Sequence, residues 1–225
     1  SQKYQFPAEK FKNWREILEE REVDRELEID KYIGVKTEYV NPLYLCKQID
    51  DILDENSIIV GDGGDFIGTA SYIIKPRKPL SWLVAGPYGT LGAGAGFSLA
   101  SKLNRPESET WLLYGDGAAG YGLMEFDTLV RHDIPVIAVI GTDASWSQIT
   151  RDQVEYLKDA VGTVLDYNNY EKIAGAFGAK GLLVKDQENL KDQLLFAKEL
   201  AQKGYPVLVN VLMGTTDFRK GSISM

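Results

Sequence analysis

Residues 114–121, with the sequence YGDGAAGY, constrain this chain more than any other stretch. The apolar run before them, 111–114, is typical of a short strand, and apolar residues recur at helical spacing after them. The glycines are therefore predicted to lie in a strand-to-helix turn. Such a turn directs backbone N–H groups and the positive end of a helix dipole at one point, which suits a phosphate group.

Asp116 lies in this turn and implies a cation, because a carboxylate next to a phosphate is repelled unless a positive ion lies between them. Mg²⁺ fits, since it prefers oxygen ligands and is commonly held by one or two carboxylates together with substrate phosphates. Residues 135–140 are predicted to form a buried parallel strand, and Asp143 follows its end. Neighbouring parallel strands end at one edge of the sheet, so Asp116 and Asp143 are predicted to form a metal-bridged diphosphate site.

Predicted strands and helices alternate along the chain from Ser57 onward. This alternation predicts a doubly wound α/β fold, in which a mainly parallel sheet is covered by helices on both faces. A helix is also predicted to begin at Asn41-Pro42. The predicted strands are 57–60, 82–84, 111–114, 135–140, 180–184 and 206–212, and the other predicted helices are 65–74, 91–103, 121–132, 169–178 and 187–203.

The composition fits one substantial domain with a smaller appendage. Of the 225 residues 44% are hydrophobic, and no apolar run approaches the roughly 20 residues that span a bilayer, so we expect a soluble, intracellular chain. Residues 1–40 are highly charged and are predicted to be a helical lead-in or linker from a preceding domain, with the diphosphate-binding domain at 41–225. The net charge of −8 argues against nucleic acid or an anionic membrane as partner.

Two other glycine-rich turns follow predicted strands. In the first, 61–65, Asp65 either caps the next helix or takes part in the site. In the second, 86–96, Gly92, Gly94 and Gly96 are similar to a dinucleotide-binding turn. Close packing of a helix on the sheet explains the same glycines, and the spacing departs from the dinucleotide pattern.

The Gly-Asp-Gly turn, the helix and buried strand after it, and the polar pair Thr142-Asp143 resemble the diphosphate-binding motif of thiamine-diphosphate-dependent enzymes. The pair is usually Asn-Asn in that family, so Asp143 adds a negative charge. The resemblance implies thiamine diphosphate and Mg²⁺ as cofactors, with Asp116, Asp143 and the backbone carbonyl of Ser145 as metal ligands. It assigns these residues to the cofactor: Gly63, Asp65, Gly89, Thr90, Leu91, Gly115, Asp116, Gly117, Ala118, Asp143 and Ser145.

In this family the segment at Gly89 and Leu91 lies under the bend of the cofactor. The resemblance implies that the Gly89 carbonyl accepts a hydrogen bond from the aminopyrimidine and that Leu91 supports the V-shaped conformation. Residues 146–148 follow the metal-binding turn, and Trp146, Ser147 and Gln148 are candidates for the substrate side, although Trp146 alone could serve to pack the loop.

Single histidine and cysteine residues exclude several other site types. His132, at the end of a predicted helix, is expected to cap it, and Cys46 is expected to pack in the core. A Ser-His-Asp or Cys-His mechanism is therefore not indicated. The tail is either a frayed terminus or a lid in which Arg219 and Lys220 meet an anionic substrate such as a coenzyme A ester.

Within the superfamily the chain is most similar to the C-terminal domain of acetolactate synthase-like proteins of the 2-hydroxyacyl-CoA lyase type. The segments that carry this resemblance are 61–66, 88–92, 122–128, 130–132 and 216–219. It implies cleavage of 2-hydroxyacyl-CoA to a shortened aldehyde and formyl-CoA. The alternative within the family is acetolactate synthase chemistry, in which pyruvate is decarboxylated and joined to a second 2-oxo acid.

The resemblance also implies what lies outside this chain. In the family a catalytic glutamate belongs to a separate pyrimidine-binding domain, usually in a partner subunit, so we expect a fragment that is inactive alone and belongs to a homodimer or homotetramer. Its partners would be small molecules, an acyl-CoA or a 2-oxo acid. A segment outside the chain could associate it with the endoplasmic reticulum. Outside thiamine chemistry, the alternatives are an NAD-binding oxidoreductase domain and a non-catalytic assembly module.

Overall fold

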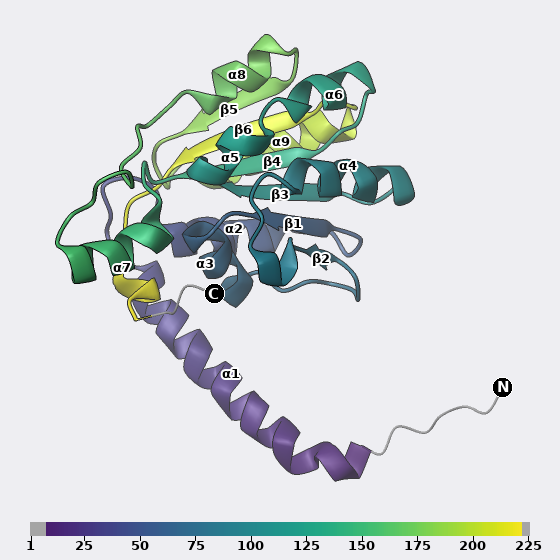
Figure 1. Cartoon of the computed structure of the whole chain (residues 1–225). Helices are drawn as coiled ribbons and strands as arrows, with labels where there is room; N and C mark the ends of the chain where they lie inside the picture. The colour runs from purple at the N-terminus through teal and green to yellow at the C-terminus, as the bar shows by residue number, and fades with distance from the viewer. Residues whose placement is uncertain (1–7, 222–225) are drawn as a thin grey trace.

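A six-stranded parallel sheet lies at the centre of the chain, which a computed structural model describes for residues 8–221 (Figure 1). The strand order is β2-β1-β3-β4-β6-β5, and every pairing in it is parallel. This arrangement confirms the predicted fold class. The strands are β1 (Ile58–Asp62), β2 (Trp82–Leu83), β3 (Thr110–Gly115), β4 (Ile137–Thr142), β5 (Lys180–Val184) and β6 (Val207–Leu212).

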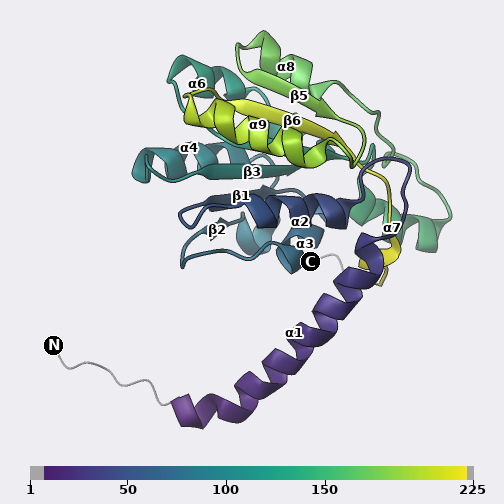
Figure 2. The ribbon, with the colours of Figure 1, turned by 180° about the vertical axis from the view of Figure 1, so that it is seen from behind.

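Helices cover both faces of the sheet (Figures 1 and 2). This two-sided cover explains why β4 and β6 are buried at every residue and read as near-continuous apolar runs. One face carries α2 (Pro42–Ile52), α3 (Asp65–Ile73) and α9 (Leu190–Gln202), and the other carries α4 (Gly94–Asn104), α5 (Asp116–Gly122), α6 (Glu125–Arg131) and α8 (Tyr170–Ala176).

The direction of winding reverses between β1 and β3. The chain runs outward from β1 to β2, and then crosses back over β1 to form β3 on its other side. The connections α3 and α4 lie on opposite faces of the sheet (Figures 1 and 2), and the residues that follow β1 and β3 line a cleft. Such a reversal is where ligands bind in open α/β sheets.

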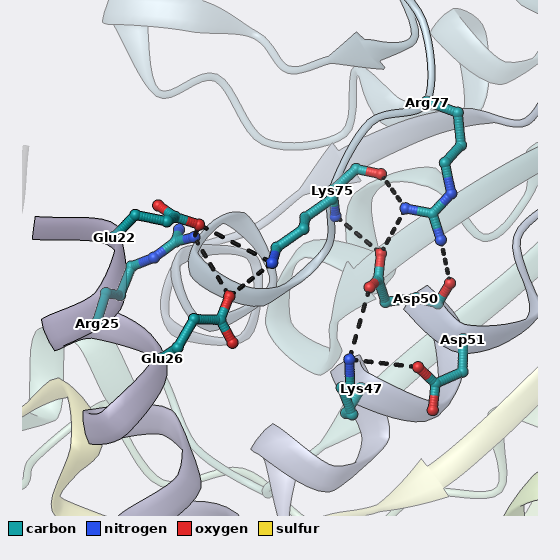
Figure 3. Close-up of polar contacts among 8 residues, drawn as sticks. All are labelled: Glu22, Arg25, Glu26, Lys47, Asp50, Asp51, Lys75 and Arg77. Atoms are coloured by element: carbon teal, nitrogen blue, oxygen red, sulfur yellow. Dashed lines mark hydrogen bonds and ion pairs between the residues drawn. The ribbon is translucent and has the colours of Figure 1, made fainter. Parts of the chain in front are cut away.

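Helix α1 (Lys12–Ile33) forms the charged lead-in and projects from the body (Figures 1 and 2). Of its residues, Ile29 alone is buried. Its Glu26 forms an ion pair with Lys75 at 2.6 Å, drawn in Figure 3. The first seven residues of the predicted lead-in lie outside the described residues, and the division into 1–40 and 41–225 stays a prediction.

The structure differs from the predicted elements in three places. The predicted helix 121–132 is two short helices, α5 and α6, and α5 already begins at Asp116. Helix α4 begins at Gly94, after the turn at 89–93. Helix α7 (Ser147–Leu157) was not predicted; its apolar residues Ile149, Val154 and Leu157 recur at helical spacing, but none of its residues is buried. The short 3₁₀ helices are η1 (Ala8–Phe11), η2 (Gly86–Tyr88) and η3 (Asp217–Arg219).

Cys46 and His132 occupy the places expected of them. Cys46 is fully buried in the core, where burial raises the pKa of its thiol far above the usual range, so it stays protonated. His132 directly follows α6 as its C-terminal cap residue. In the part of the chain covered by residues 8–221, every helix is too short or too polar to cross a lipid bilayer.

Replacing Asn41 with Ala is expected to lower the free energy of unfolding by about 2–4 kcal/mol, because its side chain's contacts with four backbone groups are lost. The fully buried Asn41 caps α2 by accepting from the amides of Leu43 at 2.8 Å and Tyr44 at 3.3 Å, and its amide donates to the carbonyls of Tyr32 and Val35 at 2.9 Å each. Urea unfolding measures the change. Asn189→Ala at the start of α9 is the control, since that side chain caps no helix amide, and an equal loss there would contradict the prediction.

Candidate functional site

A cleft with a volume of about 240 Å³ lies at the carboxyl ends of β1, β3 and β4. Most of the residues predicted for the cofactor or the substrate line it, although they come from four separate segments. Of the predicted residues, Thr90 does not line the cleft. Those that line the cleft are Gly63, Asp65, Gly89, Leu91, Gly115, Asp116, Gly117, Ala118, Asp143, Ser145, Trp146, Ser147 and Gln148.

The floor of the cleft depends on glycine at the ends of β1 and β3. Gly63 follows β1 with a φ of 136°, which L side chains rarely adopt. A β-carbon at this position would stand 2.9 Å from the backbone nitrogen of Gly115. The two strand ends can therefore approach only with glycine here, and their backbones line the cleft without side chains between them.

Asp116 is the first residue of α5 and is 3% exposed. Its oxygens accept hydrogen bonds from the backbone amides of Gly117 and Ala144, each at 2.8 Å. Burial, and secondarily the charge of Asp143, raises the pKa of Asp116 to about 7. Burial also raises the pKa of Asp143, although a 2.6 Å hydrogen bond from Ser147 Oγ opposes this.

These two carboxylates fit a bound Mg²⁺. Two desolvated carboxylates that repel one another are stabilised by a proton or by a cation, and hard oxygen ligands suit magnesium. Among the described residues, no cluster of three or more His, Cys, Asp or Glu side chains suits a metal, so a metal here would also need carbonyl oxygens. The backbone carbonyl of Ser145 can supply one, because Ser145 lines the same cleft two residues after Asp143, whereas its hydroxyl is paired with Thr150 Oγ1 at 2.9 Å.

The segment after Asp143 forms one wall of the cleft. A positive φ of 55° at Ala144 turns the chain, and Trp146 N–H donates to the Thr163 carbonyl at 2.8 Å. The Trp146 ring lies over Gly117, 2.5 Å from where a β-carbon would stand. Gln148 packs in the same way against Gly64. Both interpretations of Trp146, substrate contact and loop packing, are compatible with this position.

A second cavity of about 250 Å³ adjoins the cleft and shares Asp65 with it. Two arginines converge on this carboxylate: Arg151 from α7 forms an ion pair with Asp65, and Arg219 Nε lies 3.7 Å from it. Arg219 also stacks on Tyr72, with 5.4 Å between the guanidinium carbon and the ring centroid. The tail is thus packed against α3 as far as it is described, while residues 222–225 lie outside the described part.

Sequence reasoning missed Arg151 and Ile149, which line these cavities. The signal that could have found them is the spacing of four between Ser147 and Arg151, which places both on one face of α7, a helix that the sequence analysis does not predict. The partner of Arg151 lies 86 positions away in the sequence, and no local pattern links the two.

Comparison with known proteins places this chain in a family. The sequence profile described as "Thiamine pyrophosphate enzyme, C-terminal TPP binding domain" matches residues 62–211, which include both carboxylates. A 4-hydroxybenzoylformate decarboxylase of Rhodococcus jostii RHA1, described as thiamine diphosphate-dependent, superposes with a TM-score of 0.74 over 81% of this chain and 34% of that one. At 18% identity, this structural likeness shows a shared fold.

Curated relatives extend the match over almost the whole chain. 2-Hydroxyacyl-CoA lyase 2 from Bos taurus is 48% identical over 95% of this chain and 34% of its own length, and the Homo sapiens protein of that name is 47% identical over the same shares. A probable acetolactate synthase of Mycobacterium bovis is 35% identical over 77% of this chain and 31% of its own length. The chain spans about a third of these relatives. Since the profile covers more than half of its residues, the chain belongs to the thiamine pyrophosphate enzymes and contains their C-terminal TPP binding domain.

Proposed function

We propose that this chain is the diphosphate- and magnesium-binding part of a thiamine-diphosphate-dependent lyase that cleaves 2-hydroxyacyl-CoA to a shortened aldehyde and formyl-CoA. The observation that carries the proposal is the pair of carboxylates, buried Asp116 and half-buried Asp143, in a cleft lined by two glycine turns. The reaction class is supported by the relatives named 2-hydroxyacyl-CoA lyase 2, at 48% and 47% identity.

The residues of the cleft divide into three roles. Asp116, Asp143 and the Ser145 carbonyl would hold Mg²⁺, and the backbone at 115–118 and at Gly63 would face the diphosphate. Gly89 and Leu91 would orient the remainder of the cofactor. When bound, thiamine diphosphate supplies a nucleophilic carbon and accepts the electron pair left by C–C cleavage.

The beginning of α7 would shape the reacting side. The Trp146 ring already covers Gly117, so it can exclude water from the diphosphate turn. Ser147 is held by Asp143 at 2.6 Å, and its hydroxyl would orient that carboxylate toward the metal. Gln148 is left as the side chain whose amide could meet the substrate carbonyl or thioester. Asp65 would act through Arg151, which it binds at the rim of the cleft.

Other parts of the proposal concern the protein beyond this chain. A catalytic glutamate from a pyrimidine-binding domain would complete the site, which requires a homodimer or a homotetramer. The size of the relatives, about three times that of this chain, is compatible with such an additional domain. Association with the endoplasmic reticulum through another segment stays an expectation from the family resemblance.

A second candidate is decarboxylation and carboligation of 2-oxo acids. The relative named probable acetolactate synthase favours it, at 35% identity over 77% of the chain. Both candidates use the same cofactor site and differ in the group that leaves and in the acceptor.

The two candidates are separated by products. The full-length protein with thiamine diphosphate and Mg²⁺ is expected to convert a 2-hydroxyacyl-CoA to aldehyde and formyl-CoA, detected by mass spectrometry, and to form little acetolactate from pyruvate. The reverse preference would favour the second candidate. NAD binding that does not depend on metal, with no product from either substrate, would contradict both.

A further inference from the structure

A third carboxylate, Asp62, lies at the same sheet edge and takes no part in the function proposed above. It is the last residue of β1 and is 3% exposed, and the described cleft is lined by other residues. Its Oδ1 accepts from the amide of Gly92 at 3.1 Å and its Oδ2 from the amide of Gly94 at 2.7 Å. A buried carboxylate is costly unless its oxygens are hydrogen-bonded, so the folded chain depends on this contact.

The contact replaces a missing helix cap. Helix α4 begins at Gly94, and the residue at its N-cap position, Ala93, has no side chain that could bond the first amides. Asp62, at the end of strand β1, supplies the acceptor instead, and its negative charge lies at the positive end of the α4 dipole. The beginning of α4 is therefore fixed to the end of β1.

The approach of the two segments requires glycine on the α4 side. A β-carbon on Gly94 would stand 2.6 Å from the Asp62 β-carbon, and Gly92 has a φ of 85°. These glycines, which are similar to those of a dinucleotide-binding turn, serve here to let backbone amides reach a carboxylate.

Gly89 and Leu91, which line the cleft, directly precede this anchor. Leu91 packs against the core, and the Gly89 amide donates to the Gly86 carbonyl at 3.1 Å, while the neighbouring Tyr88 is 91% exposed. Among the described residues, two backbone amides of the segment 89–94 donate hydrogen bonds to a side chain. These are the amides of Gly92 and Gly94, and both donate to the Asp62 carboxylate.

We infer that Asp62 is a positioning residue, which fixes the segment 89–91 where it orients the part of thiamine diphosphate beyond the diphosphate group. The inference rests on the proposed function. Under this inference, different residues bind the two parts of the cofactor. The diphosphate would lie against Asp116 and its turn, and the thiamine part would lie against the segment 89–91, which Asp62 holds.

The test compares two dissociation constants of the full-length protein, measured by calorimetric titration in the presence of Mg²⁺. One titration uses thiamine diphosphate and the other uses inorganic diphosphate. Asp62→Ala is expected to raise the Kd of thiamine diphosphate about tenfold and to change that of diphosphate by less than about twofold. Asp62→Asn keeps one acceptor oxygen and provides a milder variant if the Ala protein does not fold, with a smaller shift in the same direction.

Asp50→Ala is the matched control. Asp50 is also a buried carboxylate, 5% exposed, but it lies on α2 and binds the Lys75 amide and the Arg77 guanidinium, each at 2.9 Å (Figure 3). It should lower the unfolding temperature and leave the ratio of the two Kd values unchanged. Equal weakening of both ligands by Asp62→Ala, or no change in either, would overturn the inference and leave the proposed function intact. Failure of the wild type to bind either ligand would overturn both.

Discussion

Asp116→Ala is expected to abolish magnesium-dependent binding of thiamine diphosphate, with a Kd weaker by about a thousandfold or more, which is ~4 kcal/mol. The substitution removes a metal ligand, and it also leaves the amides of Gly117 and Ala144 without their acceptor at the bottom of the cleft. A metal between the cofactor and a single remaining carboxylate would lose much of its coordination. Titration calorimetry of the full-length protein measures the effect, and addition of a chelator to the wild type should reproduce it.

Two control variants separate ligand loss from general damage. Asp143→Asn keeps an oxygen ligand and restores the usual family residue, so binding should persist within about tenfold. Asp127→Ala removes an exposed carboxylate whose recorded partner is Arg131 on the same helix, and it should change nothing. Cofactor binding that ignores both the chelator and Asp116 would show that the cleft does not hold a metal-bridged diphosphate.

Trp111→Ala is expected to lower the free energy of unfolding by about 3–5 kcal/mol, the range for deleting a large aromatic side chain from a core. Trp111 lies in central strand β3, is fully buried and belongs to the core cluster under α2, α3 and α9. Its ring N–H also donates to Glu109 Oε1 at 2.5 Å. Since small domains are stable by only about 5–15 kcal/mol, this loss would reduce the folded population at elevated temperature.

Urea unfolding measures the loss, with Trp14→Ala as the control. Trp14 lies on α1 and is 62% exposed, so its removal should change stability by less than about 0.5 kcal/mol. Trp111→Phe should cost less than the Ala variant, because the phenyl ring fills most of the space that Ala would leave empty. In both variants Glu109 keeps its ion pair with Lys198 at 3.2 Å and its hydrogen bond from Ser57 at 2.9 Å. Equal effects at Trp111 and Trp14 would contradict the assignment of β3 to the centre of the core.

The central part of the fold could be predicted because it depends on local patterns. Buried parallel strands are apolar on both faces, as at 137–142, and helices such as α2 begin with recognisable cap residues, here Asn41. The boundaries of α5 and α6 could not be read, because glycines within 115–122 serve a turn and a helix alike, and only packing decides where the helix begins.

The sequence alone determined that Asp116 and Asp143 follow strands, and parallel strands bring their carboxyl ends to one edge whatever packs around them. The tertiary structure alone decided which side chains meet there from distant segments. Asp62 reaches amides thirty positions away, and Asp65 meets Arg151 from a helix that has no buried residue. These contacts depend on how α4 and α7 pack at the edge of the sheet, and no local sequence pattern links residues that lie 30 or 86 positions apart.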